Sequence, residues 1–99
     1  MKFSFENLEV YKRALKMVRD VDSLALSLKG KVSYSFIDQM VRAALSVPLN
    51  IAEGNGRWHK NDKKNFFWIA RGSVFELVPI LDLFRQKELI DEADSAPID

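Results

Sequence analysis

Apolar residues recur at steps of three and four along three stretches of the chain, and this spacing places them on one face of an α-helix. The stretches predict helices over about residues 7–28, 35–54 and 62–87. Nowhere do apolar and polar residues alternate as they do in a half-buried strand. The connections are short, so consecutive helices are expected to run antiparallel. The pattern predicts an all-α, up-and-down bundle that forms one domain over residues 1–99.

The first predicted helix carries two neighbouring apolar stripes. One consists of Leu8, Tyr11, Leu15 and Val18, and the other of Val10, Ala14, Met17, Val21, Leu24 and Leu28. A face this broad requires two neighbouring helices, and an exposed apolar strip of that size usually marks an interface. Three helices would leave part of it uncovered, which predicts contact with another subunit.

The second predicted helix has a proline in its interior. Proline costs about 3 kcal/mol there, because it removes one hydrogen bond and crowds the preceding turn. Ile51 and Ala52 continue the apolar period beyond Pro48, so we expect a kinked but continuous helix. Gly54 is predicted to end it in the left-handed conformation. The predicted core positions are Phe36 or Ile37, Met40, Val41, Ala44, Leu45, Pro48 and Ile51.

The third predicted helix contains both a glycine and a proline. Glycine in a helix costs about 1 kcal/mol relative to alanine, so a neighbouring helix is expected to approach closely at Gly72. Pro79 predicts a second kink. The predicted apolar positions are Phe66, Phe67, Ala70, Val74, Leu77, Leu81 and Phe84.

Glycine and small polar residues mark the ends of these helices. Gly30 is a C-terminal cap for the first helix. Ser33 or Ser35 is expected to start the second, and Ser35 with Asp38 three residues later approximates a capping box. Asn61 or Asp62 is expected to cap the third.

Composition indicates an ordinary globular protein. Of the 99 residues, 47% are hydrophobic and 29% are charged, which suits one soluble domain. No apolar run approaches the roughly 20 residues that span a bilayer, and the N-terminal segment lacks the apolar centre of a signal peptide. With no cysteine, a disulfide framework, a thiolate nucleophile and a cysteine zinc site are excluded. These features predict a cytoplasmic protein without a membrane partner.

Charge is distributed unevenly along the chain. Residues 1–87 hold all 15 Lys and Arg against 9 Asp and Glu, a net charge of +6. Residues 88–99 hold 5 acidic residues and no basic one, a net charge of −5. A basic body with an acidic tail is consistent with an anionic partner, although moderate asymmetry also occurs without one.

Cations and aromatic residues are interleaved in residues 57–71. The cations are Arg57, Lys60, Lys63, Lys64 and Arg71, opposed by Asp62 alone, and the aromatic residues are Trp58, Phe66, Phe67 and Trp68. This combination suits a phosphate backbone and unstacked bases, whereas an ordinary solvated face would carry similar charge. Three consecutive aromatic residues cannot all face one way on a helix, so at least one belongs to the core. Trp58, in the turn, is expected to be exposed.

Enzyme signatures are weak. His59 is the only histidine, and without a cysteine it cannot form a transition-metal site. The GNG sequence at residues 54–56 is not the GxGxxG of a dinucleotide site. Glu53 and Glu76 would serve as an acid–base pair or a hard-metal site only if both lay exposed in one cleft. The favoured alternative is that an arginine holds each carboxylate, the candidates being Arg42, Arg57 and Arg71. No catalytic activity, metal or cofactor is predicted.

Three segments of the chain resemble one protein family. They are FENLEVYKRAL from Phe5 to Leu15, QMVRAALSVPLNIAEGNGR from Gln39 to Arg57 and IARGSVFEL from Ile69 to Leu77. They resemble the small four-helix bundle proteins encoded by intervening sequences in bacterial 23S ribosomal RNA genes. The matches cover most of residues 5–87.

The resemblance implies a four-helix bundle. Family members continue into a fourth helix, and because residues 88–99 are few and acidic we expect this helix to be truncated or minimal here. Family members form ring-like homo-oligomers, notably pentamers, and related accessory proteins of diversity-generating retroelements act with RNA and a reverse transcriptase. The resemblance implies a structural role, joining the second and third helices, for Arg42, Asn50, Glu53, Arg57, Ser73 and Glu76. Pro48, Gly54 and Gly72 complete the set of predicted structural residues.

Two functional hypotheses follow. The first is a non-catalytic homo-oligomer, pentameric by resemblance, that binds RNA or single-stranded nucleic acid. Its predicted binding residues are Arg57, Trp58, Lys60, Lys63, Lys64 and Arg71. The second is a structural or protein-interaction module in which Trp58 and Trp68 contact another subunit or a partner.

Overall fold

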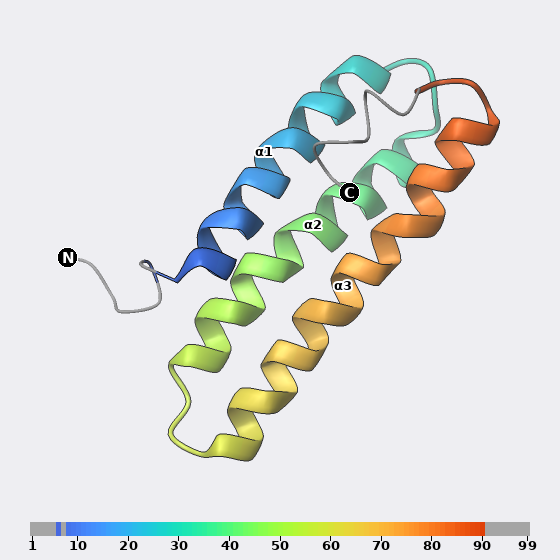
Figure 1. The fold of residues 1–99 in the computed structure, drawn as a ribbon. Helices are drawn as coiled ribbons and strands as arrows, with labels where there is room; N and C mark the ends of the chain where they lie inside the picture. Colours follow the sequence, from blue (N-terminus) through green and yellow to red (C-terminus); the bar gives the residue numbers. More distant parts are fainter. Residues whose placement is uncertain (1–5, 7, 91–99) are drawn as a thin grey trace.

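The computed structural model describes residue 6 and residues 8–90. Within this part the chain folds into three helices, α1 (Glu9–Leu28), α2 (Tyr34–Asn55) and α3 (Lys60–Gln86), and contains no strand. Figure 1 shows them following one another up and down with short connections. The prediction of an all-α fold is confirmed, and the observed helix limits differ from the predicted ones by at most two residues.

The helix ends depend less on side-chain caps than the sequence suggested. Gly30 has a φ of 83° directly after the end of α1, the left-handed conformation expected of a capping glycine. Of the two predicted starts of α2, Ser33 is the N-cap. The capping box at Ser35 is wrong, because Ser35 already lies within α2 and its hydroxyl is 2.9 Å from the hydroxyl of Ser33. For α3 the N-cap is His59, and no side chain caps the helix.

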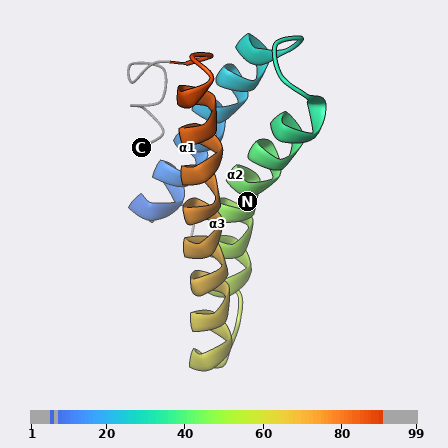
Figure 2. The ribbon, with the colours of Figure 1, turned by 90° about the vertical axis from the view of Figure 1, so that its right-hand side faces the viewer.

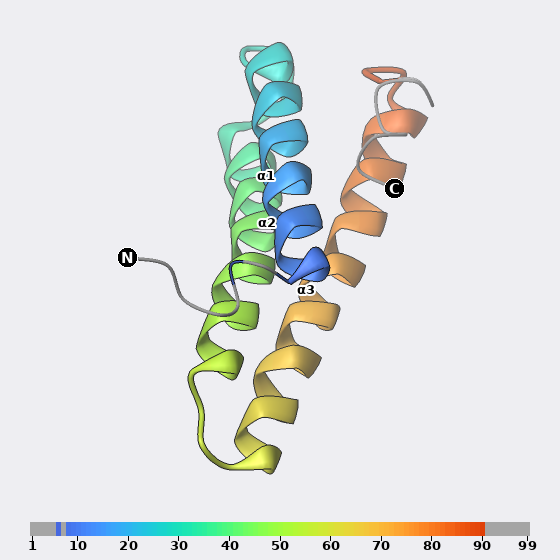
Figure 3. The ribbon, with the colours of Figure 1, turned by 60° about the vertical axis from the view of Figure 1, so that its left-hand side comes forward.

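The three helices do not contact one another to the same extent. Both α1 and α3 pack against α2 and contact each other much less. The N-terminal end of α1 lies beside the middle of α2, so among residues 6 and 8–90 the lower part is formed by α2, α3 and their connection (Figures 1 and 3). We call this part, residues 52–69, the hairpin end.

The core lies where all three helices meet. Its buried residues are Val21, Leu24, Ala25, Leu28, Met40, Ala43, Ala44, Leu77, Leu81, Phe84 and Ile90. A smaller cluster formed by Ala14, Val47, Ile51 and Ala70 continues it toward the hairpin end. At about 25 cal/mol per Å², burial of such side chains is the main source of stability.

Some residues that were predicted to be buried are exposed. In α2, Leu45 is 42% exposed, and Ala43 and Val47 are buried in its place. In α3, Val74 and Phe67 are 41% and 39% exposed. The inward face of each helix is rotated slightly from the centre of its apolar stripe, because α2 contacts two partners at once and α3 contacts mainly one.

Both prolines lie inside helices that continue past them. Pro48 is buried within α2 and Pro79 is exposed within α3. The continuous helices expected from the apolar period are therefore present.

Neither helical glycine has the role predicted for it. Gly54 does not end α2 in a left-handed conformation, since the helix runs to Asn55 and the C-cap is Gly56 with a φ of −82°. The close approach expected at Gly72 is also wrong, because no atom beyond its chain neighbours and its own helix backbone lies within 4 Å of the position a Cβ would take there. The close approach instead occurs at Gly54, which faces the beginning of α3.

The described chain closes with a turn after α3. Glu88 has a φ of 58°, and Ile90 is buried in the core. The predicted truncated fourth helix falls largely on residues 91–99, outside the described residues. Among residues 6 and 8–90, no helix combines the length and apolar composition needed to cross a bilayer.

Candidate nucleic-acid interface

The hairpin end is held together where Gly54 of α2 meets Phe66 of α3. A Cβ at Gly54 would lie 2.9 Å from the Cβ of Phe66 and 3.3 Å from the carbonyl oxygen of Lys63. Real Cβ atoms essentially never come so close to a neighbour. The absence of a side chain at Gly54 therefore lets α3 begin directly against the last turns of α2.

Arg57 strengthens the same contact. Its guanidinium lies 4.7 Å from the centre of the Phe66 ring, within the range of a cation–π interaction. It also pairs with the carboxylate of Glu53 at 3.2 Å on the protein surface. Arg57 thus connects the end of α2 to the beginning of α3, and part of its charge is already neutralised.

The three lysines of the predicted surface lie in the first two turns of α3. Lys60 and Lys64 are exposed and Lys63 is partly buried. None of them forms an ion pair with another described residue. Cations near a helix N-terminus are unfavourable because that end of the helix dipole is positive. These lysines therefore leave the hairpin end with unneutralised positive charge.

Trp58 lies in the connection between α2 and α3, beside these lysines in the chain. It is 97% exposed, the highest value among the large hydrophobic side chains described. The sequence-based expectation of an exposed Trp58 agrees with this position. An aromatic ring that contributes nothing to the core is free to stack on a ligand or partner.

Arg71 lies apart from the lysines at the beginning of α3. It follows Lys60 by 11 residues, which is about 16 Å along the helix. Its guanidinium lies 5.2 Å from the centre of the Trp68 ring and 4.9 Å from that of Phe75. Phe75 was missed by the sequence analysis because it follows the basic segment. Its spacing of four residues from Arg71 was the available signal.

A hydrogen-bonded group of small polar side chains joins α2 to α3 near their midpoints. Ser73, 5% exposed, donates its hydroxyl to Ser46 Oγ at 2.7 Å and has the carbonyl oxygen of Ile69 at 3.0 Å as an alternative acceptor. Asn50 Nδ2 donates to the carbonyl oxygen of Ser46 at 2.7 Å and to its Oγ at 2.9 Å. Asn50 and Ser73 thus meet through Ser46, which the sequence analysis did not identify.

Comparison with known proteins assigns the chain to a family. A family model described as 23S rRNA-intervening sequence protein matches residues 6–99. The chain is a 23S rRNA-intervening sequence protein. Among curated proteins, none matches it significantly. The resemblance stated from the three sequence segments is confirmed.

Two of the family motif positions do not join the helices of this 23S rRNA-intervening sequence protein. Arg42 pairs with Asp38 at 2.9 Å, one turn earlier on the same helix, and its side chain is 79% exposed. Glu76 is exposed and has no ion-pair partner among the described residues. Neither carboxylate of the Glu53 and Glu76 pair is buried and held between helices, because both lie on the surface.

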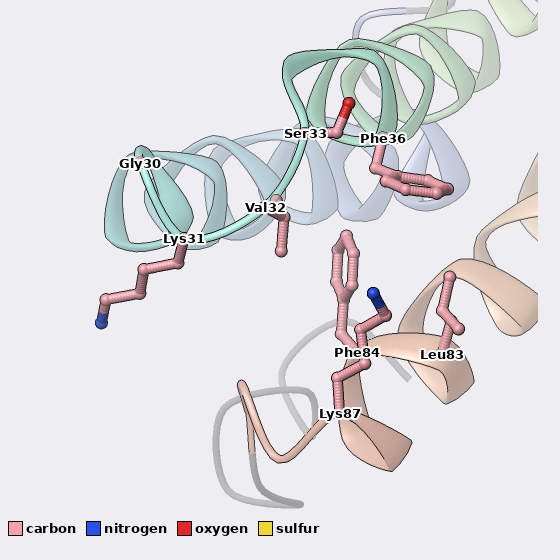
Figure 4. Close-up of a pocket in the computed structure, with 8 residues that line it drawn as sticks. All are labelled: Gly30, Lys31, Val32, Ser33, Phe36, Leu83, Phe84 and Lys87. Carbon is pink, nitrogen blue, oxygen red and sulfur yellow. The ribbon is translucent and has the colours of Figure 1, made fainter.

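Among the described residues, the surface has two hollows near helix ends. The larger one, of about 450 Å³, is lined by Leu49, Glu53 and Arg57 at the hairpin end. Figure 4 shows the smaller one, between the α1–α2 connection and the end of α3, with Phe84 at its base and Lys31 and Lys87 at its edge. Its volume is about 270 Å³, below the 300–1,000 Å³ typical of ligand pockets. No group of three His, Cys, Asp or Glu residues suited to a metal ion occurs in the described part of the chain.

Proposed function

We propose that this 23S rRNA-intervening sequence protein is a non-enzymatic, cytoplasmic homo-oligomer that binds RNA or single-stranded nucleic acid. The binding residues are Arg57, Trp58, Lys60, Lys63, Lys64 and Arg71. Ring-shaped pentamers of the four-helix bundle type are favoured by the family resemblance.

The unpaired lysines of the hairpin end carry the proposal. Lys60, Lys63 and Lys64 lie within two turns of one helix and have no acidic partner among the described residues. Phosphate groups bind such cations with release of counterions, which makes binding strong at low salt and independent of sequence. The projection of this end beyond α1 leaves it accessible (Figure 3).

The oligomer is supported by exposed apolar side chains that the three helices leave uncovered. Leu15 of α1 is 38% exposed, and Leu45 and Leu49 of α2 are 42% and 62% exposed. Apolar surface of this extent commonly marks a contact with another subunit or a further helix. The absence of catalysis is supported by the separation of the two candidate carboxylates, because the hollow that Glu53 lines does not include Glu76 and the Glu53 carboxylate is paired with Arg57.

The test compares two double variants of equal charge change. Lys63→Gln/Lys64→Gln removes two cations from the hairpin end, and Lys29→Gln/Lys31→Gln removes two exposed cations from the opposite end of the bundle. Fluorescence anisotropy with a single-stranded RNA, measured across salt concentrations, should show weaker binding and a reduced salt slope for the first variant only. A slope of about −0.7 per neutralised phosphate in single strands predicts a change of about 1.4. Equal affinity of the first variant and the wild type would refute the proposal.

A second candidate is a structural or protein-interaction module. It is favoured by Trp58, whose exposure of 97% is unusual for tryptophan in a monomer. In that case Trp58→Ala would change the mass of the oligomer or the capture of a partner protein, and nucleic-acid binding would be absent in the wild type. Light scattering and the same anisotropy series separate the two candidates.

A further inference from the structure

One exposed stripe of α3 combines cations and aromatic rings in a helical repeat. Successive members are separated by four, four, three and four residues, so they lie on one face of the helix. We call it the outer stripe, and it consists of Lys60, Lys64, Trp68, Arg71 and Phe75. All five residues are exposed. Figure 2 views the molecule from the α3 side, where this helix stands in front of the other two.

In the C-terminal half of the outer stripe, Arg71 contacts both aromatic rings. Its guanidinium is within cation–π distance of both the preceding Trp68 and the following Phe75, at 5.2 and 4.9 Å from the ring centres. Trp68 remains 61% exposed and Phe75 57% exposed. Arg71 forms no hydrogen bond or ion pair with another described residue. Two rings are therefore held in place with much of their surface open, and the guanidinium keeps its N–H donors available.

The charge of the outer stripe is entirely positive. Its three cations meet no acidic residue at any of its positions. The acidic residues of this part of α3 are Asp62 and Glu76, whose positions in the helical repeat lie well away from the stripe. At an interface between proteins, charged groups of one partner usually face opposite charges of the other, and the centre of the interface contains few charged residues. A partner that supplies both negative charge and flat apolar rings fits the outer stripe better.

We infer that the outer stripe binds one strand of unpaired nucleic acid, with bases stacked on Trp68 and Phe75 and phosphates at Lys60, Lys64 and Arg71. This rests on the proposed function and specifies its ligand as single-stranded. Every base presents a flat face to an exposed ring, whereas the bases of a duplex are already stacked. The stripe extends over 15 residues, about 22 Å, which equals about six stacked nucleotides at 3.4 Å each.

The experiment uses the full chain with a 12-nucleotide oligouridylate and an RNA duplex of equal length. Trp68→Ala and Phe75→Ala should each weaken binding of the single strand about 5- to 150-fold and leave duplex binding unchanged. Leu26→Ala is the control, because it removes a side chain that is 68% exposed on α1. Arg71→Lys keeps the charge but loses the planar group, so affinity should fall while the salt slope is retained.

Fluorescence reports stacking directly. Trp58 and Trp68 are the only tryptophans, so in Trp58→Phe the tryptophan emission comes from Trp68 alone. Addition of the oligouridylate should quench this emission, and addition of the duplex should not.

Each result separates this inference from the proposed function. If Trp68→Ala and Phe75→Ala bind the single strand within twofold of the wild type while Lys63→Gln/Lys64→Gln binds weakly, bases do not stack on the two rings, so the inference is overturned and the proposed function stands. A change of oligomer mass in Trp68→Ala and Phe75→Ala, measured by light scattering, would make the stripe a subunit interface and overturn the inference. No binding by the wild type at low salt would remove both.

Discussion

Substitution of Gly54 by alanine tests the closest contact between α2 and α3. The added Cβ would lie 2.9 Å from the Cβ of Phe66 and 3.3 Å from the carbonyl oxygen of Lys63. Both atoms are fixed by the α3 backbone, so no rotation of a side chain relieves the contact. Relief requires the two helices to separate at the hairpin end. Gly72→Ala is the matched control, because it lies in the middle of a helix with no atom beyond its chain neighbours and its own helix backbone within 4 Å of its Cβ position.

The two substitutions should change the free energy of unfolding by different amounts. Alanine in a helix interior stabilises by about 1 kcal/mol relative to glycine, which applies in full at Gly72 and at most in full at Gly54, the next-to-last residue of α2. Overpacking at Gly54 costs about 1–3 kcal/mol. Gly72→Ala should therefore stabilise by about 1 kcal/mol, whereas Gly54→Ala should be neutral or destabilise by up to about 2 kcal/mol.

Urea denaturation followed by circular dichroism at 222 nm measures this difference. Protein concentration must be equal for all variants, because an oligomer gains stability with concentration. The expected gap between the variants, about 1–3 kcal/mol, corresponds to at least about 4 °C in Tm for a domain of this size. Equal stabilisation by both alanines would show that α3 does not pack tightly on Gly54 and would refute the reasoning.

Three further substitutions test the core and the polar contacts by the same denaturation. Phe84→Ala should destabilise by about 3–5 kcal/mol, because the ring is fully buried; a loss below 1 kcal/mol would contradict its place in the core. Ser73→Ala should cost about 1 kcal/mol through loss of its hydrogen bond to Ser46, and an unchanged midpoint would show that the bond is unimportant. Arg42→Ala should change stability by less than about 0.5 kcal/mol, because its pair with Asp38 is exposed; a larger loss would indicate a contact between helices.

Periodicity predicts the helices of this protein well because their apolar stripes are long. It predicts the inward direction of each helix less well. Leu45 was assigned to the core, yet it is 42% exposed and Val47 is buried in its place. A broad apolar stripe can face two neighbouring helices, but the sequence does not give the positions of those helices. Tertiary packing therefore determines which of two adjacent apolar residues is buried.

Some features of the candidate site could be predicted from the sequence and others could not. The lysines at the start of α3 could be found from the sequence because they are neighbours in the chain. The contact between Gly54 and Phe66 could not, because a helical glycine looks the same in sequence whether a partner approaches it or not, as Gly72 demonstrates. Ser46 was missed for a similar reason, since its role depends on Ser73, 27 residues away.

Amide hydrogens at the hairpin end should exchange with solvent sooner than those beside α1. Local opening requires little free energy where few buried apolar contacts oppose it, and α1 stops short of residues 52–69 (Figure 1). These amides can then open without disturbing the main core, which includes Leu28, Met40 and Phe84. A ligand that binds the lysines of this end would have to order the least protected part of the protein. Slower exchange there on addition of RNA would therefore report binding at the level of single peptide groups.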